Sequence, residues 1–360
     1  MTLVVEKKRK HWIVAVFILF ITFYAFIAGR PIPVETILTS QWLRSLESDY
    51  PDFENTGPLI PFELGGHFGY VDFQGYFALN RVKGGYVSLS KDLWAEYQAQ
   101  PESIEVRDPL NSRIITIKNS RGYPKFLDNR IFIINYDQTS LSLVDESGII
   151  QWTRDFAAPL TYMDAAAGLI VTGALDGTVE LLDGNGRLVF PPFEPGGSRY
   201  SVILGCRISR DGSKLAIVSG IDPQRFLLLE RFGDSYKVIY HEFLPQGFRR
   251  EVHLAFIDND NRVVFERNGG LGIYTIQTRK SLFLPLDGDI HAIDGSGDDG
   301  FLFIITSETG LQKNLVVIRL PETKIIETPF ISQTVFLGRQ DSRVFIGGGT
   351  TMASFDLDKK

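Results

Sequence analysis

The chain has 360 residues, of which 44% are hydrophobic and 22% charged, and this composition excludes an intrinsically disordered protein. Its net charge is −6, and the first ten residues contribute +3, so residues 11–360 carry −9. An acidic body repels phosphate backbones, and we therefore expect no nucleic acid partner. The single Cys206 excludes an internal disulfide, and no spacing of Cys and His resembles a zinc site.

The N-terminal part of the chain predicts a membrane anchor. Residues 1–11 form a basic stub, and residues 12–29 are 18 consecutive uncharged residues. As a helix this run reaches about 27 Å, nearly the thickness of a bilayer core. Because the basic residues precede the run, we expect a cytoplasmic stub and a bacterial inner-membrane protein, single-pass, with the rest of the chain in the periplasm or outside. A cleaved secretory signal is the alternative.

Residues 30–60 are predicted to hold a short helix and a linker. In "VETILTSQWLRSLES" the apolar residues Val34, Leu38 and Trp42 are four positions apart, behind two prolines. This spacing is typical of one face of a helix. We expect a juxtamembrane amphipathic helix that either packs on the following domain or rests at the membrane interface. The segment "SDYPDFENTGP" that follows has the polar, turn-rich character of a linker.

A repeated unit occupies residues 61–358. In each copy a turn precedes an apolar strand, and the residue before the apolar core recurs at Arg130, Leu169, Lys214, Arg262, Phe301 and Arg343. The spacings of 39, 45, 48, 39 and 42 residues are periods of propeller blades. An earlier copy at Tyr76 lies 54 residues before Arg130, and residues 99–119 are interpreted as an extra hairpin within that interval. We predict an all-β fold, a β-propeller with seven blades, with six or eight as alternatives.

Acidic turns divide the strands within a repeat. "VTGALDGTVELLDGNGRLVF", residues 171–190, is predicted to form two strands and a turn, and in "SLSLVDESGIIQW" Asp145 matches Asp183 and Gly148 matches Gly186. "VDESGIIQW" resembles the repeat of PQQ-like β-propellers, and "SRDGSKLAIVSG" is similar to the WD40-like and TolB-type repeat. The resemblance covers residues 62–358. It implies a propeller with tryptophan on an outer strand, at Trp152 and, in the first blade, at Trp94.

Several other motifs are interpreted as structural. "GSGDDG" at 295–300 matches G-x-G-x-x-G, but a strand follows it where a dinucleotide site needs a helix. "FGDSY" at 232–236 lies between two strands, which favours a hairpin turn over an esterase serine. We predict no cofactor, with calcium at the carboxylates of "LDGDIHAIDGSGDD" as the alternative. The histidines His67, His241 and His253 are expected to be structural and Cys206 to be buried.

The sequence thus predicts a membrane-anchored, extracytoplasmic propeller that acts as a protein-binding scaffold for envelope proteins or peptides. The alternative is a propeller enzyme, such as a lactonase, a quinoprotein or a glycan-active enzyme, with a metal or carboxylates at the axial opening. We assign no catalytic residue and no metal ligand. The candidate partner-binding residues are Phe190, Phe193 and Tyr200, because aromatic and proline residues gather there on a long loop. Packing of these aromatic rings between blades is the other interpretation.

Overall fold

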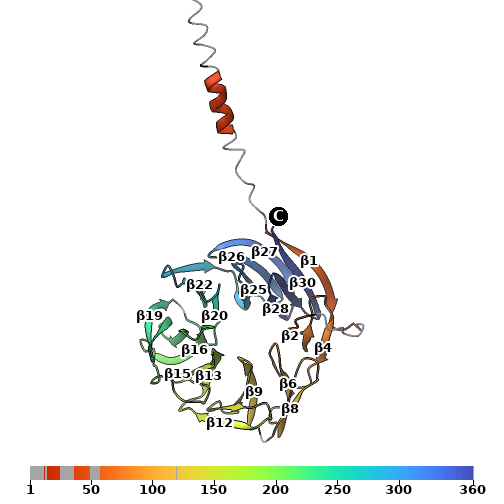
Figure 1. Ribbon diagram of the computed structural model, residues 1–360, viewed down its shortest axis with the longest axis vertical. Coiled ribbons are helices and arrows are strands. Elements are labelled where there is room, and N and C mark those ends of the chain that lie inside the picture. The colour runs from red at the N-terminus through yellow and green to blue at the C-terminus, as the bar shows by residue number, and fades with distance from the viewer. Residues whose placement is uncertain are drawn as a thin grey trace, which may run out of the picture. The chain divides into compact units, whose positions relative to one another are not determined.

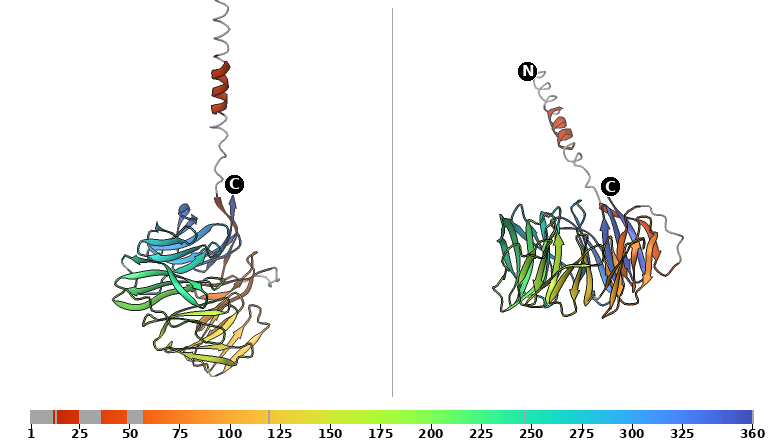
Figure 2. Two further views of the ribbon diagram at one scale, coloured as in Figure 1. Left: turned by 60° about the vertical axis from the view of Figure 1, so that its left-hand side comes forward. Right: turned by 60° about the horizontal axis from the view of Figure 1, so that its bottom comes forward.

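The computed structural model describes residues 12, 14–24, 36–48, 57–118, 120–245 and 247–359. The chain divides into two compact units, one made of Met1–Leu38 and Asp358–Lys360 and the other of Thr39–Leu357. The larger unit is a β-propeller, in which sheets follow one another around a central axis (Figure 1). Seen from two further directions, this ring of sheets is a flat disc (Figure 2).

Eight sheets make up the propeller, each built from antiparallel strands that are consecutive in the chain except where the ring closes. They are β2 to β4 (Ile60–Leu64, His67–Val71, Phe77–Val82); β5 to β8 (Tyr86–Leu89, Trp94–Tyr97, Ser103–Arg107, Ile114–Lys118); β9 to β12 (Gly122–Leu127, Arg130–Asn135, Ser140–Val144, Ile150–Asp155); β13 to β15 (Leu160–Ala166, Leu169–Ala174, Val179–Leu182); β16 to β19 (Tyr200–Ile208, Lys214–Ile221, Gln224–Phe232, Ser235–Leu244); β20 to β23 (Leu254–Ile257, Arg262–Arg267, Gly270–Thr275, Lys280–Pro285); β24 to β27 (Asp289–Asp294, Phe301–Thr309, Gln312–Arg319, Thr323–Ile331); and β28 to β30 (Val335–Gln340, Arg343–Gly348, Thr351–Lys359) with β1 (Thr36–Ser45).

The predicted repeat is confirmed in six of these sheets and its blade count is wrong. Each of the six positions from Arg130 to Arg343 begins the second strand of its sheet, namely β10, β14, β17, β21, β25 and β29. The prediction of seven blades is wrong because residues 99–119 are not an extra hairpin. They contain β7 and β8, which belong to a complete four-stranded sheet, β5 to β8. Tyr76 precedes β4, the last strand of its sheet, so the first interval in fact spans two blades.

The predicted juxtamembrane helix is wrong, since its residues form strand β1, which pairs with β30 in the order β1-β30-β29-β28. Leu38, Trp42 and Leu46 are four residues apart, and this spacing suits a helix and the alternation of a strand equally well. Trp42 in the strand and Leu46 directly after it are buried. The ring therefore closes by joining an N-terminal strand to three C-terminal ones, and the free edge of β30 determines that this segment is extended.

The predicted anchor and the predicted inner-membrane location are contradicted. Residues 14–24 are helical and their described side chains are exposed, but within the described ranges no helix combines the length and the apolar character needed to cross a membrane. The basic stub at 1–11, together with residues 13 and 25–29 of the predicted anchor, lies outside the described residues.

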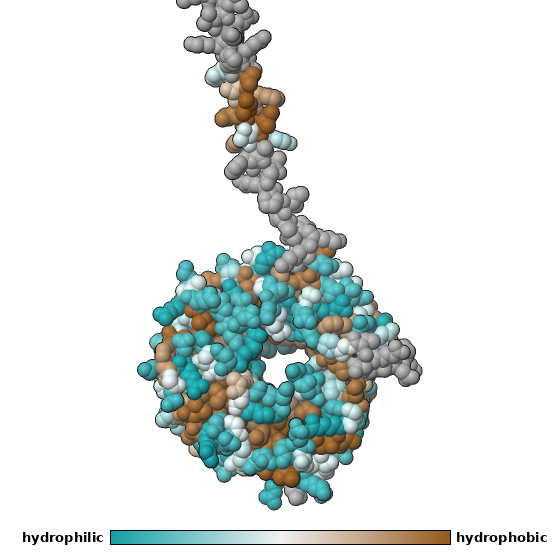
Figure 3. Space-filling model, viewed as in Figure 1, coloured by the Kyte–Doolittle hydropathy of each residue, from teal (hydrophilic) through white to brown (hydrophobic). Residues whose placement is uncertain are grey.

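The hydrophobic core lies between the blades. The sheets pack face to face, and Phe226 of β18 stacks on Phe265 of β21 with ring centroids 4.0 Å apart. Cys206 belongs to the core between the sheets of β13 and β16, and its predicted burial is confirmed. The first strands of neighbouring sheets contact one another, β9 with β13, β13 with β16 and β16 with β20. These strands therefore surround the open axis, whose rim is hydrophilic (Figure 3).

Antiparallel pairing places alternate turns at opposite ends of each sheet, so the propeller has two faces. The turns between first and second strands lie on one face, which we call the Arg210 face. There the Arg130 guanidinium donates to the carbonyl oxygen of Gly168 in the next blade. The turns between second and third strands lie on the other face, which we call the Tyr200 face.

Candidate functional site

A groove of about 640 Å³ on the Tyr200 face is the candidate site. Tyr200 at the start of β16 and Leu175 in the turn between β14 and β15 are 52% and 54% exposed. The remaining apolar lining comes from β16 and from the end of β17, with Val202, Ile203, Leu204 and Ile221. A large cavity with an apolar lining and a few polar groups at its rim is typical of a ligand-binding site.

Irregular pairing of β16 shapes the groove. Tyr200 pairs with Ile221 of β17, and the next pair is Ile203 with Ser219, so the register passes over Ser201 and Val202. A bulge of this kind bends the strand and is common beside functional sites. The middle of β16 is bound from the other side, because the Val252 amide donates to the carbonyl oxygen of Leu204 at 3.0 Å. Consecutive residues of one strand therefore line the groove.

Charged residues enter the groove from the connection between β19 and β20. Arg249, Arg250 and Glu251 all line it. The Arg250 guanidinium binds both carboxylate oxygens of Glu266, at 2.9 and 2.7 Å, and Glu266 is buried. This hydrogen-bonded pairing raises the pKa of Arg250. Arg250 is thus fixed and neutralised by Glu266, and Arg249 and Arg250 are both exposed.

A second basic group lies toward the axis, on the first strands. Lys125 of β9 and Arg207 of β16 lie 5.8 and 5.2 Å from the ring centroid of Tyr162. Arg207 pairs with Asp164 at 3.2 Å. Burial lowers the pKa of Lys125, and the strongest electrostatic effect opposing that shift comes from Glu251.

The three predicted partner-binding residues lie in different surroundings. Phe190 is half-buried and its ring centroid is 5.2 Å from that of Tyr236. Phe193 is half-buried against the same core cluster, and its amide and carbonyl both bond to Val179. Only Tyr200 lines the groove. The sequence analysis missed two groove residues, Leu175 between β14 and β15 and Arg249 between β19 and β20. The one available signal for Leu175 was an apolar residue directly before an Asp-Gly turn.

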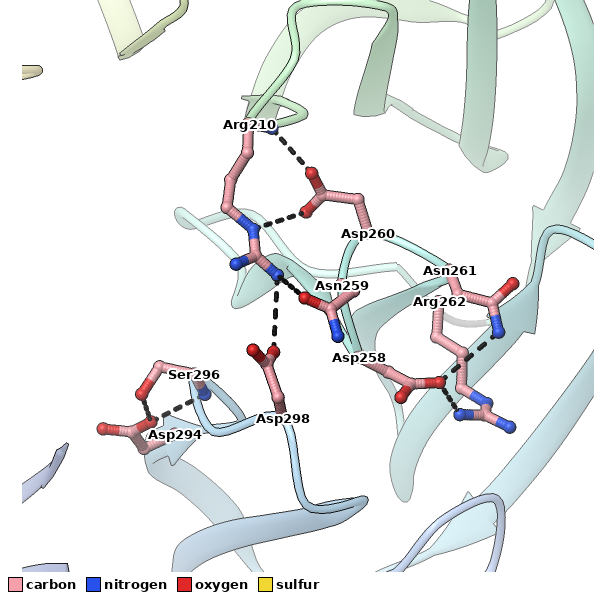
Figure 4. A network of polar contacts seen from close by, with 9 residues as sticks. All are labelled: Arg210, Asp258, Asn259, Asp260, Asn261, Arg262, Asp294, Ser296 and Asp298. Atoms are coloured by element: carbon pink, nitrogen blue, oxygen red, sulfur yellow. Dashed lines mark hydrogen bonds and ion pairs between the residues drawn. The ribbon is translucent and has the colours of Figure 1, made fainter. Parts of the chain in front are cut away.

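The Arg210 face carries most of the acidic turn residues that were considered for calcium. Arg210 contacts two other turns, because its backbone amide donates to Asp260 at 2.7 Å and its guanidinium reaches Asn259 of the same turn at 3.2 Å and Asp298 of the next blade at 3.6 Å (Figure 4). Asp294 accepts hydrogen bonds from the amide and hydroxyl of Ser296 in the same view. Asp298 and Asp294 thus serve separate contacts, and Asp289 lies at the other end of β24.

The enzyme alternative called for several carboxylates or histidines gathered at the axis. In the part of the chain that the structure describes, no three His, Cys, Asp or Glu side chains are arranged to hold one metal ion. The Nδ1 atom of His67 lies 3.0 Å from Asn80 Oδ1 and the Nε2 atom of His253 lies 3.2 Å from the carbonyl of Ile290. "GSGDDG" and "FGDSY" are turns between β24 and β25 and between β18 and β19, as predicted.

Comparisons with known proteins agree on the fold. An uncharacterised protein of Treponema pallidum (strain Nichols) is 25% identical over 361 residues, which cover 98% of this chain and 95% of the relative. The crystal structure of BamB from Moraxella catarrhalis is similar with a TM-score of 0.59 and 11% identity, covering 89% of this chain and 100% of BamB. The dihydro-heme d1 dehydrogenase NirN in complex with DHE is similar with a TM-score of 0.54 and 12% identity, covering 71% of this chain and 58% of NirN.

At such identities the two structural similarities show the fold alone. The sequence pattern of a family described as beta-propeller protein matches residues 4–360. Because that match spans nearly the whole chain and the structure contains a closed ring of eight blades, this chain belongs to the beta-propeller protein family.

Proposed function

We propose that this propeller is a protein-binding scaffold and that the groove on the Tyr200 face binds an extended segment of a partner protein. The observation that carries the proposal is the exposure of Leu175 and Tyr200 over an apolar cavity. Exposed apolar residues that gather at one cavity are typical of interaction sites. Envelope proteins, which the sequence analysis predicts as partners, are one source of such segments.

The shape of the groove favours an extended segment. Five consecutive residues of β16, from Tyr200 to Leu204, line it. A segment lying along this strand meets side chains and backbone alternately, as peptides do when they bind beside a strand. The rigid ring of sheets holds the groove in place, so the partner supplies the flexible element of the pair.

The proposal is tested with the full chain immobilised and a library of random twelve-residue peptides displayed on phage. Wild-type protein should enrich peptides that carry large apolar residues. Leu175→Asp and Tyr200→Ala should abolish the enrichment, because each removes apolar contact area from the rim.

Two matched variants control for changes in the surface as such. Leu311 lies in the corresponding turn between β25 and β26 and is also 54% exposed, and Tyr86 is an exposed tyrosine at the start of β5. Neither residue lines the groove. Leu311→Asp and Tyr86→Ala should enrich the same peptides as the wild type. Equal enrichment by Leu175→Asp and the wild type would show that the groove is not the binding site.

A further inference from the structure

Two arginines at the groove have no acidic partner among the described residues. Arg249 lines the groove, and the Arg199 guanidinium lies 5.2 Å from the ring centroid of Tyr200. Both residues are exposed, and within the described ranges no carboxylate oxygen lies within 4.0 Å of either guanidinium. They approach the groove from different connections, Arg199 from the segment before β16 and Arg249 from the segment before β20.

The other charges around the groove are already matched. Arg250 is paired with Glu266, and its guanidinium also lies 4.4 Å from the ring centroid of Phe248. Glu251 also lines the groove and offsets one positive charge there. Three arginines (Arg199, Arg249 and Arg250) therefore face two glutamates (Glu251 and Glu266), and an excess of one positive charge remains at the groove, although residues 11–360 as a whole are acidic.

We propose, resting on the function proposed above, that the groove selects partner segments in which an Asp or Glu side chain neighbours a large apolar residue. The apolar residue would fill the cavity beside Leu175 and Tyr200. The carboxylate would bind Arg249 and Arg199, because a guanidinium forms its strongest hydrogen bonds with a carboxylate. Arg199, stacked on Tyr200, couples the apolar and the charged contacts.

The displayed library tests this selectivity directly. The peptides are fused to the coat protein through their C-terminal ends, so any selected carboxylate belongs to a side chain. Peptides enriched by wild-type protein should contain Asp or Glu beside an apolar residue more often than the input library. Arg249→Glu should instead enrich peptides with Lys or Arg at that position, since reversing the charge reverses the preference.

A synthetic peptide then gives the magnitude. The most enriched acidic peptide and its Asp→Lys or Glu→Lys version are titrated against each protein by fluorescence polarisation. Arg249→Glu should weaken binding of the acidic peptide by about tenfold or more and strengthen binding of the lysine version. Arg187→Glu, at an exposed turn on the Arg210 face, makes the same change in net charge and should leave both affinities unchanged.

The outcomes separate the two proposals. If wild-type protein enriches apolar peptides without acidic residues, or if Arg249→Glu enriches the same peptides as the wild type, the acidic selectivity is overturned while the groove remains a binding site. If wild-type protein enriches no peptide, or if Leu175→Asp enriches the same peptides, the groove function fails and the selectivity fails with it.

Discussion

The indole Nε1 of Trp152 donates a hydrogen bond of 2.9 Å to the carbonyl oxygen of Gly184 in the next blade. Trp152 lies on the outer strand β12, as the resemblance to PQQ-like repeats implied, and Gly186 of the same turn lies beneath its ring. Trp42 of β1 repeats the arrangement, with its Nε1 bonded to the Phe73 carbonyl at 2.8 Å and Gly75 against its ring. Trp94 does not, because it lies on the second strand β6.

The contact between Trp152 and Gly186 should be measurable as stability. A Cβ atom added at Gly186 would lie 2.8 Å from the Trp152 ring, and the φ of +75° already disfavours other residues. Gly186→Ala should therefore reduce the free energy of unfolding by about 2–3 kcal/mol. Gly168→Ala is the matched control, because Gly168 has a φ of +76° with open space around it, and should cost about 1 kcal/mol. Urea denaturation measures both, and equal losses would contradict a role for the tryptophan contact.

Arg339 of β28 should strongly stabilise the contact between its sheet and the neighbouring sheet of β24 to β27. Its buried guanidinium pairs with Asp299 and donates to the carbonyl oxygens of Phe301 and Asp341. Asp299→Asn leaves this cation without its counter-ion, and we expect a loss of about 3 kcal/mol in urea denaturation. Asp92→Asn, at the exposed pair with Lys91, should change stability by less than about 1 kcal/mol. Similar losses in both variants would rule out a special role for burial.

Asp294 should make stability fall as the pH rises. Burial raises the pKa of its carboxyl above the ordinary 3.8, and the two hydrogen bonds from Ser296, together with the attraction of Arg339, only partly oppose this shift. Between 3.8 and the raised value the folded chain holds a proton that the unfolded chain has lost, so stability declines across that interval and stays lower above it. Asp294→Asn keeps an oxygen to accept both Ser296 hydrogen bonds, and it should be more stable than the wild type at pH 7. Thermal unfolding near pH 3.5 should show that advantage lost.

Asp211 gives the opposite sign and serves as the comparison. The Ser209 hydroxyl, donating at 2.7 Å, lowers the pKa of Asp211 to about 2. Its contribution to stability is therefore present above pH 3.8 and lost as the pH falls toward about 2. Asp211→Asn should be less stable than the wild type at pH 7 and should lose less stability between pH 4 and pH 2. The same sign of change at pH 7 in Asp294→Asn and Asp211→Asn would refute the assignment.

Phe193 and Tyr200 should separate packing from binding. Phe193 contacts the core cluster between the blades, so Phe193→Ala should lower the melting temperature of the chain. Tyr200 is 52% exposed, and Tyr200→Ala should leave the melting temperature nearly unchanged while peptide enrichment is lost. Differential scanning calorimetry beside the display selection measures both effects. A Phe193→Ala variant with unchanged melting temperature and no peptide enrichment would instead identify Phe193 as a contact residue.

The parts of the fold that depend on neighbours in the chain could be predicted from the amino-acid sequence. Asp145 and Asp183 were predicted as equivalent turns, and each carboxylate accepts the backbone amides two and four residues ahead, Ser147 and Ile149 in one turn and Asn185 and Arg187 in the other. Such turns are local, because one side chain bonds the backbone that immediately follows it. The six second strands were found for a similar reason, since each couples a turn directly to an apolar run.

Features that depend on partners far away in the chain could not be predicted from local patterns. The spacing of Leu38, Trp42 and Leu46 fits a helix and a strand alike, and the unpaired edge of β30, about 300 residues later, makes it a strand. The sheet of β5 to β8 was not predicted as a blade because its turns do not follow the spacing of the other repeats. The number of blades is determined by closure of the ring. The groove unites Leu175, Tyr200 and Arg249 from three separate connections, and no local pattern records that juxtaposition, because only the circular arrangement of blades brings those turns to one face.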